Sequence, residues 1–236
     1  TYDHKVKRYF SSDSFKPAFI KPDTDSYFRQ LRDDMLALKA NPDPWLSFQP
    51  EHDIALMPKR NIDPKILRSV TSSVKSRKTL KILYQSMSSA EPTWREISPH
   101  AFAFDGMRWH ARSYCHRGHT YKDFLLSRIQ RIGGYSDTAW PEEEDKIWNT
   151  YFKLILKPHP KLSKSQAKVV ALDYDMKEEQ LELNIRLALL YYYLRRLGLQ
   201  DCDGESADPR EQHVVVSNKT ETKNAQMNIK ELSGLS

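Results

Sequence analysis

Apolar residues recur along the first part of the chain at a spacing that predicts helices. Between residues 27 and 40 they return every three or four positions, as on one face of an amphipathic helix. The stripe consists of Phe28, Leu31, Met35 and Leu38. Asp25 or Ser26 can cap this helix, and the run NPDPW ends it because proline cannot continue a helix. A second helix is expected from Pro64 to about Lys75, with Asp63 as its cap and Ile66, Leu67, Val70 and Val74 on its inner face.

From residue 79 the period of the pattern changes to two, which predicts β-strands. Four runs alternate in this way: TLKILYQS (79–86), WREISPHAFAF (94–104), MRWHARSYC (107–115) and YKDFLLSRI (121–129). The second run should bend near Pro99, and Asp105-Gly106 is a strong signal for a hairpin turn. Four short strands joined by tight turns suggest a small β-barrel.

The remaining residues predict a second, mixed region. A strand is expected over 151–160, followed by a helix in which Ser163 and Gln166 form a capping box. The run QLELNIRLALLYYYLRRLG should be a strand that continues into a helix ending at Gly198. HVVVSN can add a last strand, and residues 217–236 are expected to form a weakly ordered, flexible tail. The fold class expected from these elements is α+β.

Composition narrows the class of protein. Apolar residues make up 39% of the 236 residues, which is enough to bury a core. The two cysteines, Cys115 and Cys202, do not form a disulfide framework and fit a reducing, cytoplasmic environment. No apolar run reaches the ~18 residues that a membrane span needs, so no membrane partner is expected.

Positive charge is concentrated in one segment. The chain has a net charge of +6, and the residues from Lys75 to Arg131 include 11 Lys and Arg but only 4 Asp and Glu. A clustered basic surface attracts polyanions. The alternative is that these long side chains only solvate an exposed strand face.

The strand 107–115 separates its side chains onto two faces, because neighbouring strand residues point to opposite sides. Met107, Trp109, Ala111, Ser113 and Cys115 should form an apolar inner face. The other face carries Arg108, His110, Arg112 and Tyr114, and guanidinium groups bind phosphate oxygens well. We therefore expect a pocket for an anionic, nucleotide-bearing ligand. The competing interpretation pairs the arginines with Glu96, Asp105 and Asp123 in surface salt bridges.

These strands carry a pattern that resembles the WYL domain. It comprises Arg95 with Pro99, Asp105-Gly106, Trp109, and Phe124 with Arg128-Ile129, although the name-giving triplet is Trp109-His110-Ala111 in this chain. RWHARSYC together with KLILKPHPKLS is most similar to WYL repressors encoded beside bacterial phage-defence systems of the BREX and CBASS types. The resemblance covers about residues 1–200.

The resemblance implies a winged helix-turn-helix, then an Sm/SH3-like WYL barrel, then a small C-terminal α/β dimerisation domain. No winged helix is visible from Thr1 onward, so the DNA reader is expected to precede this chain. The expected divisions are a connector over 1–62, the WYL domain over 63–137, the dimerisation domain over 138–216 and the tail over 217–236. The implied ligand-binding residues, to which the strand face adds Arg108, are Tyr84, Ser86, Arg95, His100, His110, Arg112 and Arg128. Arginines would hold phosphates, His110 and Tyr84 would face a base, and Ser86 and His100 would fix orientation.

The expected function is that of a homodimeric transcriptional repressor whose WYL pocket binds a nucleotide or oligonucleotide and so controls binding to a DNA operator. A constitutive module that binds single-stranded nucleic acid without switching is the alternative. Enzymatic activity is not expected, although Ser86 with His100 could be imagined as nucleophile and base. No cofactor or metal is expected either, since Cys115, His116 and His119 match no standard zinc spacing.

Overall fold

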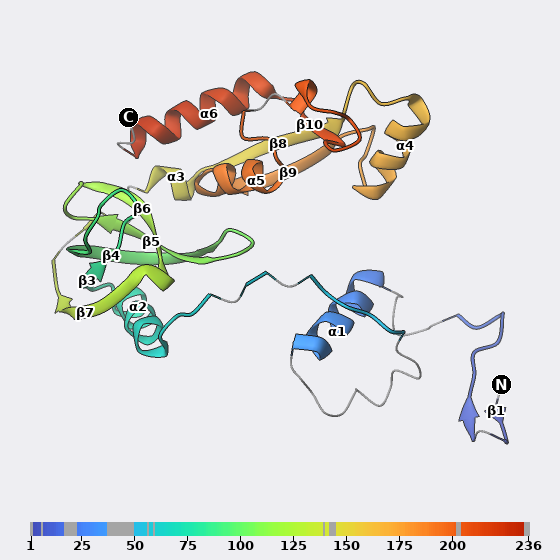
Figure 1. Ribbon diagram of the computed structural model, residues 1–236, viewed down its shortest axis with the longest axis horizontal. Helices are drawn as coiled ribbons and strands as arrows, with labels where there is room; N and C mark the ends of the chain where they lie inside the picture. Colours follow the sequence, from blue (N-terminus) through green and yellow to red (C-terminus); the bar gives the residue numbers. More distant parts are fainter. Residues whose placement is uncertain are drawn as a thin grey trace. The chain divides into compact units, whose positions relative to one another are not determined.

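The structure is a computed structural model that describes residues 2–5, 7–16, 23–36, 50–55, 57–58, 60–138, 140–141, 145–201 and 204–233 (Figure 1). The chain divides into two compact units, Thr1–Pro58 and Lys59–Ser236. The division lies close to the boundary expected at residue 62. No helix within these described ranges is long and apolar enough to cross a membrane.

The described residues of the first unit form a short hairpin and one helix. Strands β1 (Tyr2–Asp3) and β2 (Arg8–Tyr9) pair antiparallel, and helix α1 spans Thr24–Leu36. The helix begins earlier than expected because the Asp23 carboxylate, rather than Asp25 or Ser26, accepts hydrogen bonds from the first amides of the helix. The expected continuation to residue 40 and the NPDPW run lie outside the described residues.

An antiparallel five-stranded sheet forms the first half of the second unit. Its strands are β3 (Thr79–Tyr84), β4 (Thr93–Phe104), β5 (Trp109–Cys115), β6 (Thr120–Leu125) and β7 (Ile129–Ser136), arranged in the order β6-β5-β4-β3-β7. A short 3-10 turn, η1 (Leu126–Arg128), connects β6 to β7. The expected strands are confirmed, and β7 was not anticipated. No pairing joins the edge strands β6 and β7 among the described residues, so closure into a barrel stays a prediction.

Helix α2 (Pro64–Ser76) covers one face of this sheet and builds its core. Asp63 accepts a hydrogen bond from the Lys65 amide, as its predicted role of cap requires. Ile66 and Val70 pack against a cluster that includes Leu80, Ile82 and Ile97. Leu67 was expected on this inner face, but it is 43% exposed because it lies outside the buried stripe.

The β4–β5 hairpin matches the prediction in its turn but not in its whole inner face. The pairing shifts register between Pro99 and Ala101, which is the expected bend. Ala111, Ser113 and Cys115 are buried as expected. Trp109 is 49% exposed and Met107 37% exposed, because both lie at the end of the hairpin.

The second half of the unit has its own core around a three-stranded antiparallel sheet with the order β10-β8-β9. Its elements are α3 (Lys146–Asn149), β8 (Tyr151–Pro158), α4 (Lys164–Asp173), β9 (Leu181–Arg186), η3 (Leu187–Leu189), α5 (Leu190–Arg196), η4 (Gly204–Ser206) and β10 (Val214–Val216). The Ser163–Gln166 capping box is confirmed. Two separate cores agree with the expected division near residue 137, which remains a prediction.

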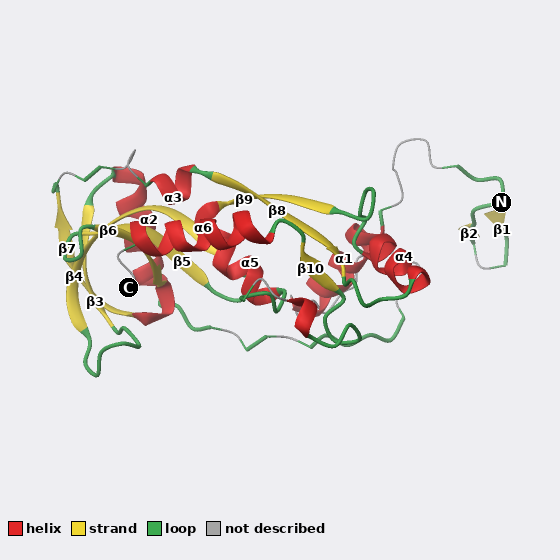
Figure 2. Cartoon of the chain, turned by 90° about the horizontal axis from the view of Figure 1, so that it is seen from above, coloured by secondary structure: helices red, strands yellow, loops and turns green. Residues whose placement is uncertain are grey.

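The expectation of a weakly ordered tail is wrong for residues 217–233, the part of that segment that the structure describes. Helix α6 spans Lys219–Leu232 and runs along the three-stranded sheet (Figure 2). Ala225 and Ile229 pack against the second core, so the helix is held by burial of an apolar face. The polar composition of this segment concealed that narrow stripe.

Candidate functional site

The structure divides the eight side chains expected to line one pocket into two groups. The first, called here the Arg112 group, consists of His100, Arg108, His110 and Arg112, whose polar atoms meet carboxylates. The second, called the Arg95 group, consists of Tyr84, Ser86, Arg95 and Arg128, on and beside β3 and β4 and in the turn before β7.

Arg112 lies on β5 and is only 4% exposed. Its Nε and Nη2 donate to the two oxygens of Asp145 at 2.8 and 2.9 Å, which is a bidentate pair. Its Nη1 donates to Asp123 Oδ1 at 3.3 Å. Burial opposes the charge, but the hydrogen bonds and charges of Asp145 and Asp123 outweigh it and raise the pKa of Arg112 above its ordinary value.

Asp145 joins three structural elements. It caps α3 by accepting a hydrogen bond from the Trp148 amide at 3.1 Å, and it also accepts from His100 Nε2 at 2.9 Å. Burial disfavours its charge, but the bonds from His100 and Arg112 outweigh that effect and lower the pKa of Asp145 to about 2. The carboxylate is therefore ionised in the physiological range of pH.

Asp105 likewise accepts hydrogen bonds from several groups, at the hairpin turn. Its Oδ2 accepts from Arg108 Nε and His110 Nε2, each at 2.9 Å, while its Oδ1 accepts from the amides of Met107 and Arg108. Burial works against the charge, but these bonds prevail and lower the pKa of Asp105 to about 2. The turn and both basic side chains are thus held by one carboxylate.

Tyr192 of α5 connects the second core to the same network. Its hydroxyl donates to Asp123 Oδ2 at 2.9 Å, and its ring lies 5.0 Å from the ring of His110. Burial, and then the negative charge of Asp123, raise the pKa of the Tyr192 hydroxyl, so it stays protonated and donates. Contacts from α3 and α5 therefore cover the basic face of β5.

This arrangement differs from the expected open pocket. The basic face of β5 is buried against residues 145 and 192 rather than turned to solvent, and its cations already have partners. The competing interpretation, with Asp105 and Asp123 as partners, is closer to what the structure shows, although the pairs are buried. Asp145 was not among the carboxylates expected to pair with these arginines, because it lies 33 positions after Arg112 in the sequence.

The Arg95 group has a different character. Strand register places Arg95 opposite Ile82, and Thr93 opposite Tyr84, so all four share the face that carries the core. The Nε of Arg95 and the Oγ1 of Thr93 are buried and have no hydrogen-bond partner among the described residues. Thr93 was not predicted, although its position two residues before Arg95 was a signal for it.

Of the other members of the Arg95 group, Tyr84 ends β3, Ser86 follows that strand and Arg128 belongs to η1. The Tyr84 hydroxyl accepts from the Leu125 amide at 3.2 Å, and its ring packs edge-on against Phe124. Ser86 exchanges a hydrogen bond with Ser88, and the Arg128 carbonyl accepts from the amide of Gln85, the residue after β3. Within the described ranges the Arg128 guanidinium forms no salt bridge.

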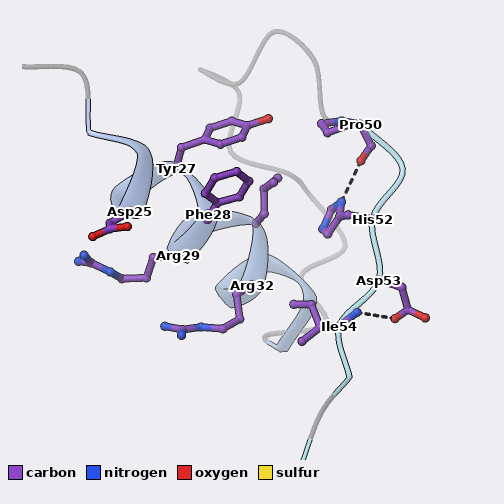
Figure 3. A pocket seen from close by; sticks show the side chains of 10 residues that line it. Asp25, Tyr27, Phe28, Arg29, Arg32, Pro50, His52, Asp53 and Ile54 are labelled. Atoms are coloured by element: carbon purple, nitrogen blue, oxygen red, sulfur yellow. Dashed lines mark hydrogen bonds between the residues drawn. The ribbon is translucent and has the colours of Figure 1, made fainter. Parts of the chain in front are cut away.

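A separate hollow lies in the first unit, between α1 and residues 50–54 (Figure 3). Arg29 and Arg32 line it together with Asp25 and Asp53, so it has no excess of positive charge. None of the predicted ligand-binding residues lies there.

Comparison with known families supports the division of the second unit. Residues 65–133 match the WYL domain family. Residues 151–222 match the family described as "BrxR transcriptional regulator, C-terminal dimerization domain". The sheet and the second core thus define a WYL-domain transcriptional regulator.

Relatives along the whole length make this assignment specific. The chain is 34% identical over 224 residues to "DNA-binding transcriptional repressor CapW" of Stenotrophomonas maltophilia, covering 94% of this chain and 74% of that protein. It is 32% identical over 231 residues to the protein of that name from Pseudomonas aeruginosa, again covering 94% and 74%. The chain therefore belongs to the CapW family of WYL-domain transcriptional repressors.

A solved structure, "Proteasome accessory factor B/C (PafBC) of Arthrobacter aurescens", is similar with a TM-score of 0.31 and 14% identity, covering 71% of this chain and 27% of that one. A similarity this low supports no argument about function.

Proposed function

We propose that this chain is the ligand-sensing and dimerising part of a DNA-binding transcriptional repressor, and that its Arg95 group binds a nucleotide or a single-stranded oligonucleotide. The relatives' name and the two matched domains support the role of a dimeric repressor rather than an enzyme. A phage-defence operon as its target follows from the sequence resemblance alone.

The buried, unpaired Nε of Arg95 is the observation that carries the ligand site. A buried donor without a partner costs about 1–3 kcal/mol, and more when it belongs to a charged group. Functional sites are where proteins tolerate such costs, because a ligand supplies the missing partner. Thr93 Oγ1, on the same face of β4, offers a second unpaired polar atom to that ligand.

The chemistry of the group favours an anion. Arg95 and Arg128 can donate to phosphate oxygens, and neither forms a salt bridge with a described carboxylate, in contrast to Arg112. The hydroxyls of Thr93 and Ser86 can either donate or accept. Tyr84, whose hydroxyl is bonded to Leu125, positions the site rather than facing a base.

The Arg112 group connects the sheet that carries this site to the C-terminal half of the unit. Arg112 and His100 come from the neighbouring strands β5 and β4, and Asp145 begins the C-terminal half. A ligand that shifts these strands changes the geometry of the Arg112–Asp145 ion pair. It thereby changes the free-energy difference between the ligand-bound and ligand-free arrangements of the two halves. Typical couplings of this kind are ~1 to 3 kcal/mol.

The ligand site can be tested by fluorescence anisotropy with a fluorescein-labelled short oligothymidylate and the 236-residue chain. Arg95→Ala should weaken binding by about 10-fold or more, since bonds to charged groups contribute about 1.5–3 kcal/mol. Arg117→Ala, which removes an exposed arginine from the β5–β6 turn, is the matched control and should bind like the wild type. Equal oligothymidylate affinity of the Arg95→Ala and wild-type chains would contradict the assignment of the ligand site to the Arg95 group.

Switching needs a second measurement, made on a protein that binds its operator. In an operator mobility-shift assay, the oligonucleotide should change operator affinity for the wild type. Arg112→Ala should leave oligonucleotide binding in place and abolish that change. An oligonucleotide that binds without altering operator affinity would favour the constitutive module instead.

A further inference from the structure

Three large apolar side chains are exposed together at the end of the β4–β5 hairpin, which Figure 1 shows ending clear of the other strands of its sheet. Phe104 is 48% exposed, Met107 37% and Trp109 49%. Phe104 and Trp109 are direct cross-strand partners, and their ring centroids are 4.9 Å apart. We call these three residues the hairpin patch.

The hairpin patch is presented by a rigid turn. Asp105 Oδ1 accepts from the amides of Met107 and Arg108 at 2.8 and 2.6 Å, and the Asp105 amide donates to the Arg108 carbonyl at 3.1 Å. Gly106 has φ 91°, which any other residue would adopt only under strain. A surface fixed in advance loses little conformational entropy when a partner binds.

The surroundings of the hairpin patch favour a protein partner over a nucleic acid. Arg108 and His110, the basic residues of the hairpin itself, both bond to Asp105, so the hairpin presents little uncompensated charge. The side chain of Arg196 lies directly over Gly106, where a Cβ would collide with it. Trp, Phe, Met and Arg are the residue types enriched in the centres of protein–protein interfaces.

The contact between Arg196 and Gly106 indicates which protein partner would cover the hairpin patch. Arg196 belongs to α5, within residues 151–222 that match a dimerization domain. On that helix Tyr191 is 49% exposed and Tyr193 38% exposed. The hairpin patch therefore borders the domain through which the family is described as dimerising.

We propose that the hairpin patch of the WYL sheet is part of the homodimer interface, so that a second copy of this chain covers Phe104, Met107 and Trp109. The interface thus extends beyond residues 151–222 onto the domain that carries the proposed ligand site. It does not depend on the identity of any ligand.

Sedimentation velocity of the 236-residue chain over a concentration series tests this proposal. Trp109→Ala and, separately, Phe104→Ala should each raise the dimer dissociation constant by about 30-fold or more, the effect of removing an interface hot spot. Trp94→Ala is the matched control, because Trp94 is 42% exposed at the far end of the same strand β4. Thermal unfolding followed by circular dichroism checks that each variant is folded.

Exposed apolar residues on α4 provide the rival surface. Leu172 is 72% exposed and Val169 64% exposed. If Leu172→Asp dissociates the dimer while both hairpin variants dimerise like the wild type, the interface lies on α4 and the proposal is overturned. A wild-type chain that stays monomeric at every concentration overturns it as well, and neither result bears on oligothymidylate binding by Arg95.

Discussion

Arg95 and Arg112 lie on neighbouring strands of one sheet, yet they differ in whether their nitrogens have carboxylate partners. Arg95 on β4 is half-buried and Arg112 on β5 is buried. Arg112 donates from three nitrogens to two carboxylates, whereas the buried Nε of Arg95 has no partner among the described residues. The role of a strand arginine is therefore decided by whether a distant part of the chain supplies a carboxylate.

The difference is also one of free energy. A buried ion pair with good geometry offsets its desolvation, and removing one partner leaves an uncompensated buried charge. Arg95 has no such compensation, so it should lower stability until a ligand binds. The Arg112 group should thus behave as a structural connection and the Arg95 group as a binding site.

The largest effect is expected from Asp145→Asn. The amide removes the charge that faces Arg112 and His100 in a buried site, so the free energy of unfolding should fall by about 3–5 kcal/mol. Urea denaturation measures it. Asp137→Asn is the control, since Asp137 is 82% exposed and pairs with Lys78 at the surface, where such pairs contribute about 0–1 kcal/mol. Equal losses in the two variants would contradict the distinction.

Acid should weaken the same connection. The pKa of Asp145 is about 2 in the folded chain, against an ordinary value of 3.8, so the unfolded state binds the proton first as pH falls. Its contribution of about 2 kcal/mol is fully present only above about pH 5 and is lost as pH falls through about 2. Unfolding free energies measured over that window should decline less in Asp145→Asn than in the wild type; parallel curves would contradict this.

Tyr192→Phe should have a smaller effect. It deletes one hydrogen bond to Asp123, which keeps Arg112 as a partner, so the loss should be about 1.5 kcal/mol. Tyr191→Phe alters an exposed neighbour on the same helix and should be neutral. A Tyr192→Phe variant as stable as the control would show that α5 is not held to the sheet by this bond.

Arg95→Met should have the smallest effect on stability and a large one on binding. Replacing an unpaired, partly buried cation with an apolar side chain of similar length should change the unfolding free energy by less than about 1 kcal/mol, or increase it. The same substitution at Arg112 should destabilise by several-fold more. Comparable losses of unfolding free energy in Arg95→Met and Arg112→Met would contradict the distinction between the two arginines.

The sequence was a good guide wherever local patterns decide the structure. The two-residue period gave the strands, Asp63-Pro64 gave the start of α2, and Asp105-Gly106 gave the hairpin turn. The charge count locates the excess of positive charge in residues 75–131, but it cannot show which basic side chains are paired with carboxylates.

What the sequence concealed depends on contacts between distant residues. Asp145 lies 33 positions after Arg112, and Tyr192 lies 69 positions after Asp123. Strand alternation predicts which residues share a face but not what covers that face, so the basic face of β5 was expected to be open. Helix α6 was missed for the same reason, since its few apolar residues matter only against the second core.

The three contacts made by Asp145 limit how domains can be exchanged between relatives of this chain. One carboxylate caps α3 and bonds to both His100 and Arg112, and those two side chains come from the other half of the unit. A chimera that joins this sheet to a foreign C-terminal half will need an aspartate at the same junction. Recombination should therefore favour crossovers that keep both sides of this contact from a single parent.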